Sequence, residues 1–119
     1  MTESLVGRRG QTFPAAHRLK NRQDFLQCKK MGRKVHTSHF LIFIEQHQRP
    51  GPSRLGLTVS RKVGNAVVRN RVKRLVREFF RTRYHQLAAN CSYSVIAKRN
   101  AGEIEFEDLC CQLQVILKQ

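Results

Sequence analysis

The spacing of apolar and polar residues predicts a short helix near the start of the chain. Residues 22–31 lie between Asn21, a favourable N-cap, and Gly32, a favourable stop. The apolar residues of this segment are Phe25, Leu26, Cys28 and Met31. Residues 1–17 mix glycine, arginine and proline without a period, so we expect a flexible N-terminal tail there.

Two strands are predicted next. Residues 39–46 form a short run of aromatic and branched apolar side chains, and the proline-rich stretch 49–54 after them is a strong turn signal. Residues 54–60 then alternate, with Leu55, Leu57 and Val59 on one face. We expect the two strands to pair as a hairpin.

The period becomes helical after this hairpin. Asn65 is the expected cap of a helix that runs to about His85 or Leu87. Strand character returns over 92–99, and helical spacing with acids in the first turn returns over 105–118. The resulting order of helices and strands predicts an α+β sandwich.

The length of the chain bounds this architecture. A chain of 119 residues is expected to bury about two-thirds of its unfolded surface in one core. We find no internal repeat and no linker, so residues 18–119 are expected to form a single domain.

The long predicted helix has two different faces. One face is apolar and carries Val68, Val72, Leu75, Val76, Phe79 and Phe80. The opposite face carries Arg69, Asn70, Lys73, Arg74, Arg77 and Arg81. We expect the apolar face to pack against the sheet and leave the cationic face in water, where it can meet a ligand.

The net charge points to an anionic partner. It is +15, with an isoelectric point of about 10.9. Residues 1–102 hold 22 Lys and Arg against four acids, whereas residues 103–119 hold one cation and four acids. Stability does not require such a charge, and it repels itself on folding, so a polyanionic partner is the simplest explanation. The C-terminal segment is expected to lie outside the binding surface.

Three interpretations of the cationic helix face compete. A merely solvated face usually mixes charges of both signs, but Glu78 is the only acid between residues 46 and 102. A membrane-surface helix would need the apolar face that the core also needs. Nucleic-acid binding suits the excess of arginine, whose planar fork matches phosphate, and is the interpretation we favour.

Metal binding and secretion are disfavoured by composition. The four cysteines are Cys28, Cys91, Cys110 and Cys111, and none forms the CxxC pair of a zinc site. No stretch reads as a signal peptide or is long enough to span a bilayer. We expect a reduced, cytoplasmic protein without a membrane partner.

The longest motif, "GNAVVRNRVKRLVREFF", resembles the RNR signature of the bacterial ribonuclease P protein subunit. The stretches "RLKNRQDF", "LGLTVSRKVGNAVVRNRVKRLVRE" and "VIAKR" also occur in the order and spacing of that family, and the resemblance as a whole covers about residues 18–117. The resemblance implies about three helices on a small four-stranded mixed sheet with a left-handed βαβ crossover. It also implies a partnership with a catalytic RNA, the complex removing the 5′ leader from precursor tRNA and leaving a 5′-phosphate on the mature tRNA.

The resemblance also assigns roles to residues. Arg69, Asn70 and Arg71 match the RNR triplet, which faces the catalytic RNA in the family. The basic positions associated with that helix are Arg61, Lys62, Lys73, Arg74, Arg77 and Arg81. Magnesium is expected to be bound mainly by the RNA, and neither an organic cofactor nor DNA is expected.

A cleft between the first helix and the sheet takes the single-stranded leader in the family. Its positions correspond to Phe25, Leu41 and Phe43, although these side chains are equally compatible with a core. Lys29 stands where the family often has a second aromatic side chain, which weakens the stacking surface and substitutes a phosphate contact.

Two other functions are considered. Protein-borne catalysis would need paired carboxylates or an acid–base pair, yet Glu3, Asp24, Glu45 and Glu78 are scattered. The histidines are His17, His36, His39, His47 and His85, and we expect His36 and His39 to be surface or hydrogen-bonded residues. A ribosomal or RNA-chaperone protein would share the charge and size without needing the helix signature.

Overall fold

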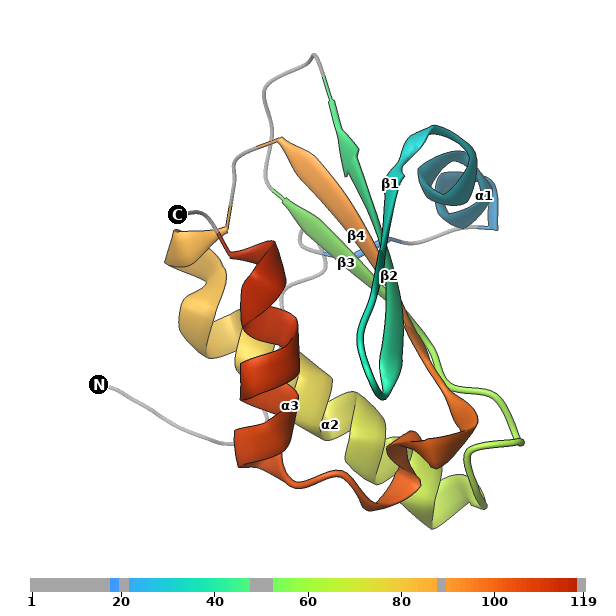
Figure 1. The fold of residues 1–119 in the computed structure, drawn as a ribbon. Helices are drawn as coiled ribbons and strands as arrows, with labels where there is room; N and C mark the ends of the chain where they lie inside the picture. The colour runs from blue at the N-terminus through green and yellow to red at the C-terminus, as the bar shows by residue number, and fades with distance from the viewer. Residues whose placement is uncertain (1–17, 20–21, 48–52, 88–89, 118–119) are drawn as a thin grey trace.

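The computed structural model describes residues 18–19, 22–47, 53–87 and 90–117. The predicted tail over 1–17, the Asn21 cap and most of the 49–54 turn lie outside these residues. The main elements are α1 (Arg22–Met31), β1 (Arg33–His36), β2 (Phe40–Gln46), β3 (Arg54–Thr58), α2 (Ala66–Arg83), β4 (Cys91–Ala97) and α3 (Phe106–Leu113). Three helices on a four-stranded sheet confirm the predicted α+β sandwich (Figure 1).

The order of strands in the sheet is β1-β2-β4-β3. Strand β4 pairs antiparallel with β2 and parallel with β3, and α2 makes the crossover between the two parallel strands. The predicted hairpin of 39–46 with 54–60 is therefore wrong, because β4 lies between these two strands. Six of the seven residues of β4 are buried, and a central position is the one that buries such a strand on both faces.

The hairpin that does form joins β1 to β2, with Lys34 opposite Phe43 and His36 opposite Leu41. Strand β1 was not predicted from the pattern. Its sequence, Arg-Lys-Val-His, is mostly polar and exposed, which suits an edge strand but produces no apolar alternation.

The main core lies between the sheet and the pair α2 and α3. Its largest fully buried side chains include Phe40, Phe79, Phe80, Tyr93 and Leu109. The rings of Phe79, Phe80 and Tyr93 meet edge to face, with neighbouring centroids 5.7 Å apart. The apolar face predicted for the long helix is thus the face that packs on the sheet.

Helix α1 lies on the opposite face of the sheet (Figure 1). The thiol of Cys28 anchors it there, 3.4 Å from the carbonyl oxygen of Phe43 on β2 and 3.5 Å from that of Ser92 on β4. The molecule therefore has three layers: two helices, the sheet and one helix.

The two later helices end earlier than predicted. A 3₁₀ helix, Tyr84–Gln86, continues α2, and another, Gln114–Ile116, continues α3. The segment after α3 then pairs with the segment after α2 through an antiparallel bridge between Leu87 and Leu117.

Candidate nucleic-acid interface

The basic helix α2 begins at a well-formed cap. The side-chain oxygen of Asn65 accepts a hydrogen bond of 3.0 Å from the backbone N–H of Val68, as predicted. Arg61 and Lys62 are exposed in the turn that leads into the helix. They therefore stand in water next to its first turn.

The two faces of α2 separate as predicted. Val72, Val76, Phe79 and Phe80 are buried in the core. On the other side Asn70, Arg74, Arg77 and Arg81 are exposed and Lys73 is partly exposed. We call these five residues the cationic stripe.

Three of the predicted cations are held by the protein itself. Arg69 donates from Nε to the carbonyl oxygen of Gly64 at 3.2 Å. Arg71 turns away from the stripe, donates to the carbonyl oxygen of Gly102 at 3.3 Å, and lies 3.9 Å from Glu105.

Arg81 is the third. It forms a two-point ion pair with Glu78, with distances of 3.1 and 2.6 Å. Glu78 thus neutralises the C-terminal end of the stripe. The cations of the stripe that have no hydrogen-bond or ion-pair partner among the described residues are Lys73, Arg74 and Arg77, one and two turns earlier.

The predicted cleft residues occupy the sheet face on which α1 lies. Phe40 and Ile42 point into the main core, so Leu41 and Phe43 point to the other face, where α1 covers part of the sheet. Across the sheet, Leu41 lies beside Ile96 of β4. Both side chains are partly exposed, and they form an apolar floor next to α1.

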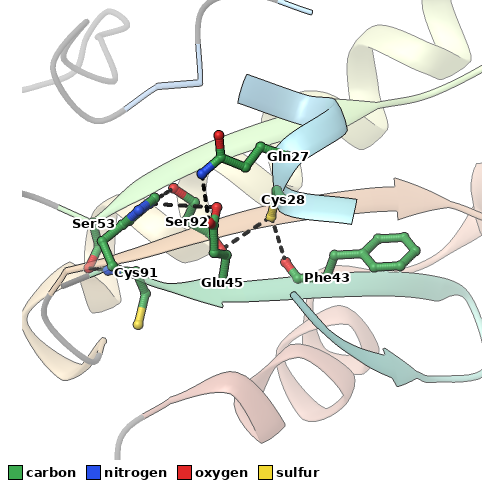
Figure 2. A network of polar contacts seen from close by, with 8 residues as sticks. Gln27, Cys28, Phe43, Glu45, Ser53, Cys91 and Ser92 are labelled. Carbon is green, nitrogen blue, oxygen red and sulfur yellow. Dashed lines mark hydrogen bonds and ion pairs between the residues drawn. The ribbon is translucent and has the colours of Figure 1, made fainter. Parts of the chain in front are cut away.

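Phe43 lies one register row closer to α1. Its side chain is 9% exposed, and Figure 2 shows the ring extending away from the polar contacts under α1. Lys34 of β1 places its ammonium nitrogen 6.0 Å from the centroid of this ring, within the range of a cation–π contact. Lys29 is exposed on α1.

Phe25 faces a different group of residues. Its ring lies against the backbone of Gly56 on β3, and it lines a pocket together with Lys73 and Arg77 of α2. The structure therefore brings one predicted leader residue to the cationic stripe, whereas Leu41, Phe43 and Lys29 do not line that pocket.

Sequence reasoning missed three residues of this surface: Arg18, Lys34 and Ile96. Lys34 belongs to the unpredicted edge strand, and Ile96 joins Leu41 only through the β2–β4 register. No local signal marks Lys34. Arg18 and Ile96 lie in the family-like stretches "RLKNRQDF" and "VIAKR", which were the available indications.

A polar network lies under α1 (Figure 2). Gln27 donates to Glu45 at 3.0 Å, and the ring nitrogen Nε2 of His47 lies 2.5 Å from Ser92 Oγ and 3.9 Å from Glu45. A hydrolytic triad would need the carboxylate on the other ring nitrogen and an accessible serine, but Ser92 is 1% exposed. This network is therefore a structural one that fastens α1 to β2 and β4.

Cys28 belongs to the same network. Burial, followed by the negative charge of Glu45, raises the pKa of this thiol to about 11. The group is therefore protonated near neutral pH and is a poor nucleophile.

Among the described residues, no group of three or more histidine, cysteine, aspartate or glutamate side chains could hold a metal ion. Within that same part of the chain, no helix combines the length and the apolarity needed to cross a bilayer. A basic α+β sandwich that presents its longest helix as a cationic stripe has the architecture of a nucleic-acid-binding protein.

Comparison with known proteins identifies the family. The family model described as Ribonuclease P matches residues 13–119. The ribonuclease P protein component of Desulfovibrio desulfuricans is 41% identical over 110 residues, which cover 90% of this chain and 85% of the relative. That of Geotalea uraniireducens is 40% identical over 107 residues, with coverages of 90% and 93%.

Solved structures of the same family resemble this chain in fold. The RNase P protein of Staphylococcus aureus superposes with a TM-score of 0.78 at 31% identity, covering 85% of this chain and 92% of that one. That of Thermotoga maritima superposes with a TM-score of 0.75 at 31% identity, with coverages of 85% and 94%. The chain belongs to the ribonuclease P protein component family, whose members are subunits of a ribonucleoprotein of tRNA processing.

Proposed function

We propose that this chain binds a catalytic RNA and that the complex removes the 5′ leader of precursor tRNA by endonucleolytic hydrolysis, leaving a 5′-phosphate on the mature tRNA. The observation that carries the proposal is the cationic stripe of α2, in which Lys73, Arg74 and Arg77 have no hydrogen bond or ion pair to another described side chain. Family membership supports the same role.

The protein contributes charge and aromatic surface to this reaction. Guanidinium and ammonium groups of the stripe neutralise RNA phosphates and let two polyanions approach each other. We assign the cleavage step to the RNA partner and expect the protein alone to be inactive.

In this proposal Mg²⁺ is bound mainly by the RNA. Mg²⁺ is held by carboxylates and phosphate oxygens, whereas the stripe offers cations, and the nearby carboxylate of Glu78 already binds Arg81. The chain's own residues thus fit the phosphate backbone better than the metal. DNA and membranes are not part of the proposal.

The single-stranded leader is proposed to lie on the apolar floor beside α1. Leu41 and Ile96 form the floor, and Phe43 with Lys34 above its ring forms one side. Lys29 is exposed on α1 and can meet a leader phosphate. Such a surface suits unpaired bases of many sequences, since every base has an apolar face that can stack.

Reconstitution tests the function. The purified protein is mixed with a ribonuclease P RNA and precursor tRNA at a magnesium concentration too low for the RNA alone. We expect leader removal only when protein and RNA are both present. Leader removal by the protein without RNA would contradict the division of labour.

Two control arms separate this function from its competitors. In the first arm, the annealing of two unrelated RNAs is measured without a ribonuclease P RNA. A general RNA chaperone would accelerate this annealing and would not remove a leader. Vesicles of anionic lipid detect a membrane helix, which would bind them in preference to RNA.

A further inference from the structure

The turn between β1 and β2 is fastened to helix α3 by the side chain of Gln112. The amide oxygen of Gln112 accepts hydrogen bonds of 2.9 Å from the hydroxyl group of Thr37 and from the backbone N–H of His39. The amide nitrogen lies 2.6 Å from Nδ1 of the His39 ring, and it donates to Asp108 on α3 at 3.3 Å. We call Thr37, His39 and Gln112 the hairpin latch.

The segment after β4 holds the same turn through its backbone. Lys98 donates from its backbone N–H to the carbonyl oxygen of His39 at 2.8 Å, and from Nζ to that of Thr37 at 2.6 Å. Asn100 donates to the carbonyl oxygen of Ser38 at 3.2 Å. Strand β1 lies at the edge of the sheet with β2 as its neighbour, so these contacts and the hairpin latch give the hairpin a second attachment.

The contacts of Gln112 determine which ring nitrogen of His39 carries the proton. A rotated amide would turn its NH₂ group toward the backbone N–H of His39 and its oxygen toward the carboxylate of Asp108, so both neighbours oppose the rotation. The amide nitrogen therefore donates to Nδ1 of His39, and the neutral ring carries its proton on Nε2. A proton on Nδ1 would set a donor against a donor and remove this contact.

The charged and titratable groups near this ring act in opposite directions on a protonated imidazole. Lys98 binds the turn through its ammonium group and repels a positive ring, and Arg99 beside it is exposed. Asp108 attracts a positive ring, but the amide of the latch lies between the two groups. His36 on the hairpin and Cys111 on α3 are exposed. Since attraction and repulsion oppose each other, the lost hydrogen bond decides the direction in which acid acts.

We propose that the hairpin latch positions the β1–β2 hairpin and opens when His39 gains a proton. Strand β1 carries Lys34, whose ammonium group lies above the ring of Phe43, and this strand leads directly into the turn. An open latch therefore leaves that cation less well positioned. The latch itself rests on the contacts of the turn alone. Its effect on leader binding rests on the proposed function, in which Lys34 forms one side of the leader surface.

NMR of the isolated protein tests the latch. The nitrogen chemical shifts of the His39 ring report the tautomer, and we expect the neutral ring to carry its proton on Nε2. Between about pH 7.5 and pH 5.5 histidine gains a proton, and exchange of the His39 amide hydrogen, corrected for the intrinsic effect of pH, should accelerate by about threefold or more, the equivalent of one lost hydrogen bond. A neutral ring protonated on Nδ1, or exchange that does not respond to acid, would overturn the proposal.

Variants of the latch residues separate its opening from general effects of acid. His39→Asn places a side-chain oxygen near the site of Nδ1, and this acceptor takes up no proton, so the response to acid should disappear. Gln112→Glu should reverse the response, because a carboxylate accepts a hydrogen bond from a protonated ring. His36→Asn, at an exposed position of the same hairpin, is the matched control and should behave like the wild type. A response that His39→Asn retains would refute the role of His39.

Binding measurements with the assembled ribonucleoprotein test the effect on the leader. The affinity for precursor tRNA is divided by the affinity for mature tRNA, so that effects of acid common to both RNAs cancel. Over the same pH interval this ratio should fall by about threefold in the wild type and stay constant in His39→Asn. A constant ratio in the wild type would refute the positioning role. Absence of leader removal in every complex would instead refute the proposed function, and the NMR test of the latch would stand unaffected.

Discussion

The ring of Phe25 packs directly on the backbone of Gly56, so closely that a β-carbon at position 56 would come within 2.6 Å of the ring atom Cζ. The same β-carbon would lie 2.8 Å from a methyl group of Leu19. The absence of a side chain at one position of β3 thus allows α1 to lie against this edge of the sheet. Phe25 also lines the pocket that contains Lys73 and Arg77, so this contact fixes one wall of that pocket.

Gly56→Ala is expected to destabilise the protein by about 1–3 kcal/mol, the usual cost of adding a methyl group to a packed site. Urea unfolding measures the change. The double variant with Phe25→Leu, in which a smaller side chain faces the new methyl, should lose less stability than the two single variants combined. Strict additivity would show that the Phe25–Gly56 contact does not limit the packing.

Asn65→Ala should lower the free energy of unfolding by about 1 kcal/mol, because it removes the acceptor for the N–H of Val68 at the start of α2. Asn65→Asp keeps an acceptor and should retain stability. Asn70→Ala, at an exposed position inside the same helix, is the matched control and should be neutral or stabilising. Equal losses in Asn65→Ala and Asn70→Ala would contradict the capping role.

Cys28 should resist thiol reagents at pH 8 while Cys111, which is exposed, reacts rapidly. The pKa of Cys28 is raised from 9.0 to about 11 in the folded protein, so its contribution to stability is complete below pH 9 and is lost as the pH rises toward 11. The unfolding free energy of the wild type should therefore fall more steeply over this interval than that of Cys28→Ala. Parallel curves would show that this thiol does not titrate as described.

Arg77→Ala should weaken binding to the catalytic RNA more than Arg81→Ala. Arg77 has no ion-pair partner among the described residues, whereas Arg81 already pairs with Glu78. The slope of log affinity against log salt should fall by about one for Arg77→Ala and by less for Arg81→Ala, since each phosphate contact releases about one counterion. Affinity that is independent of salt in the wild type would refute the electrostatic model altogether.

Phe43→Ala should weaken the binding of precursor tRNA with a leader of several nucleotides by about 1–3 kcal/mol, the typical value of stacking on an aromatic ring. Binding of mature tRNA should stay nearly unchanged. Thermal unfolding must accompany the measurement, because Phe43 is only 9% exposed. Equal losses for the two RNAs at unchanged stability would show that the ring does not contact the leader.

Local pattern was sufficient for the presence of the three α-helices and for the two faces of α2. Asn65 caps the helix, Val72 and Phe79 are buried, and Arg74 and Arg77 are exposed, all as the spacing indicates. These features depend on residues three or four positions apart, so the periodicity of a single segment carries the information.

The pairing of the strands depended on the tertiary structure. A turn signal after β2 marks a reversal of the chain but does not specify the neighbouring strand, and β4, which comes more than thirty residues later, lies between β2 and β3. Burial on both faces favours this central place for β4, and only the packing of α1 on one side and α2 with α3 on the other creates that burial.

The functional surface likewise depends partly on local sequence pattern and partly on tertiary structure. The sequence by itself determined that α2 carries a cationic face and that the chain suits a polyanion, because charge and helical period are local properties. Only the tertiary structure turned Arg71 toward Gly102 and placed Phe25 beside Lys73. Such contacts join residues that are distant in the chain, and they form where the packing of whole elements brings a donor to an acceptor or leaves room beside a glycine.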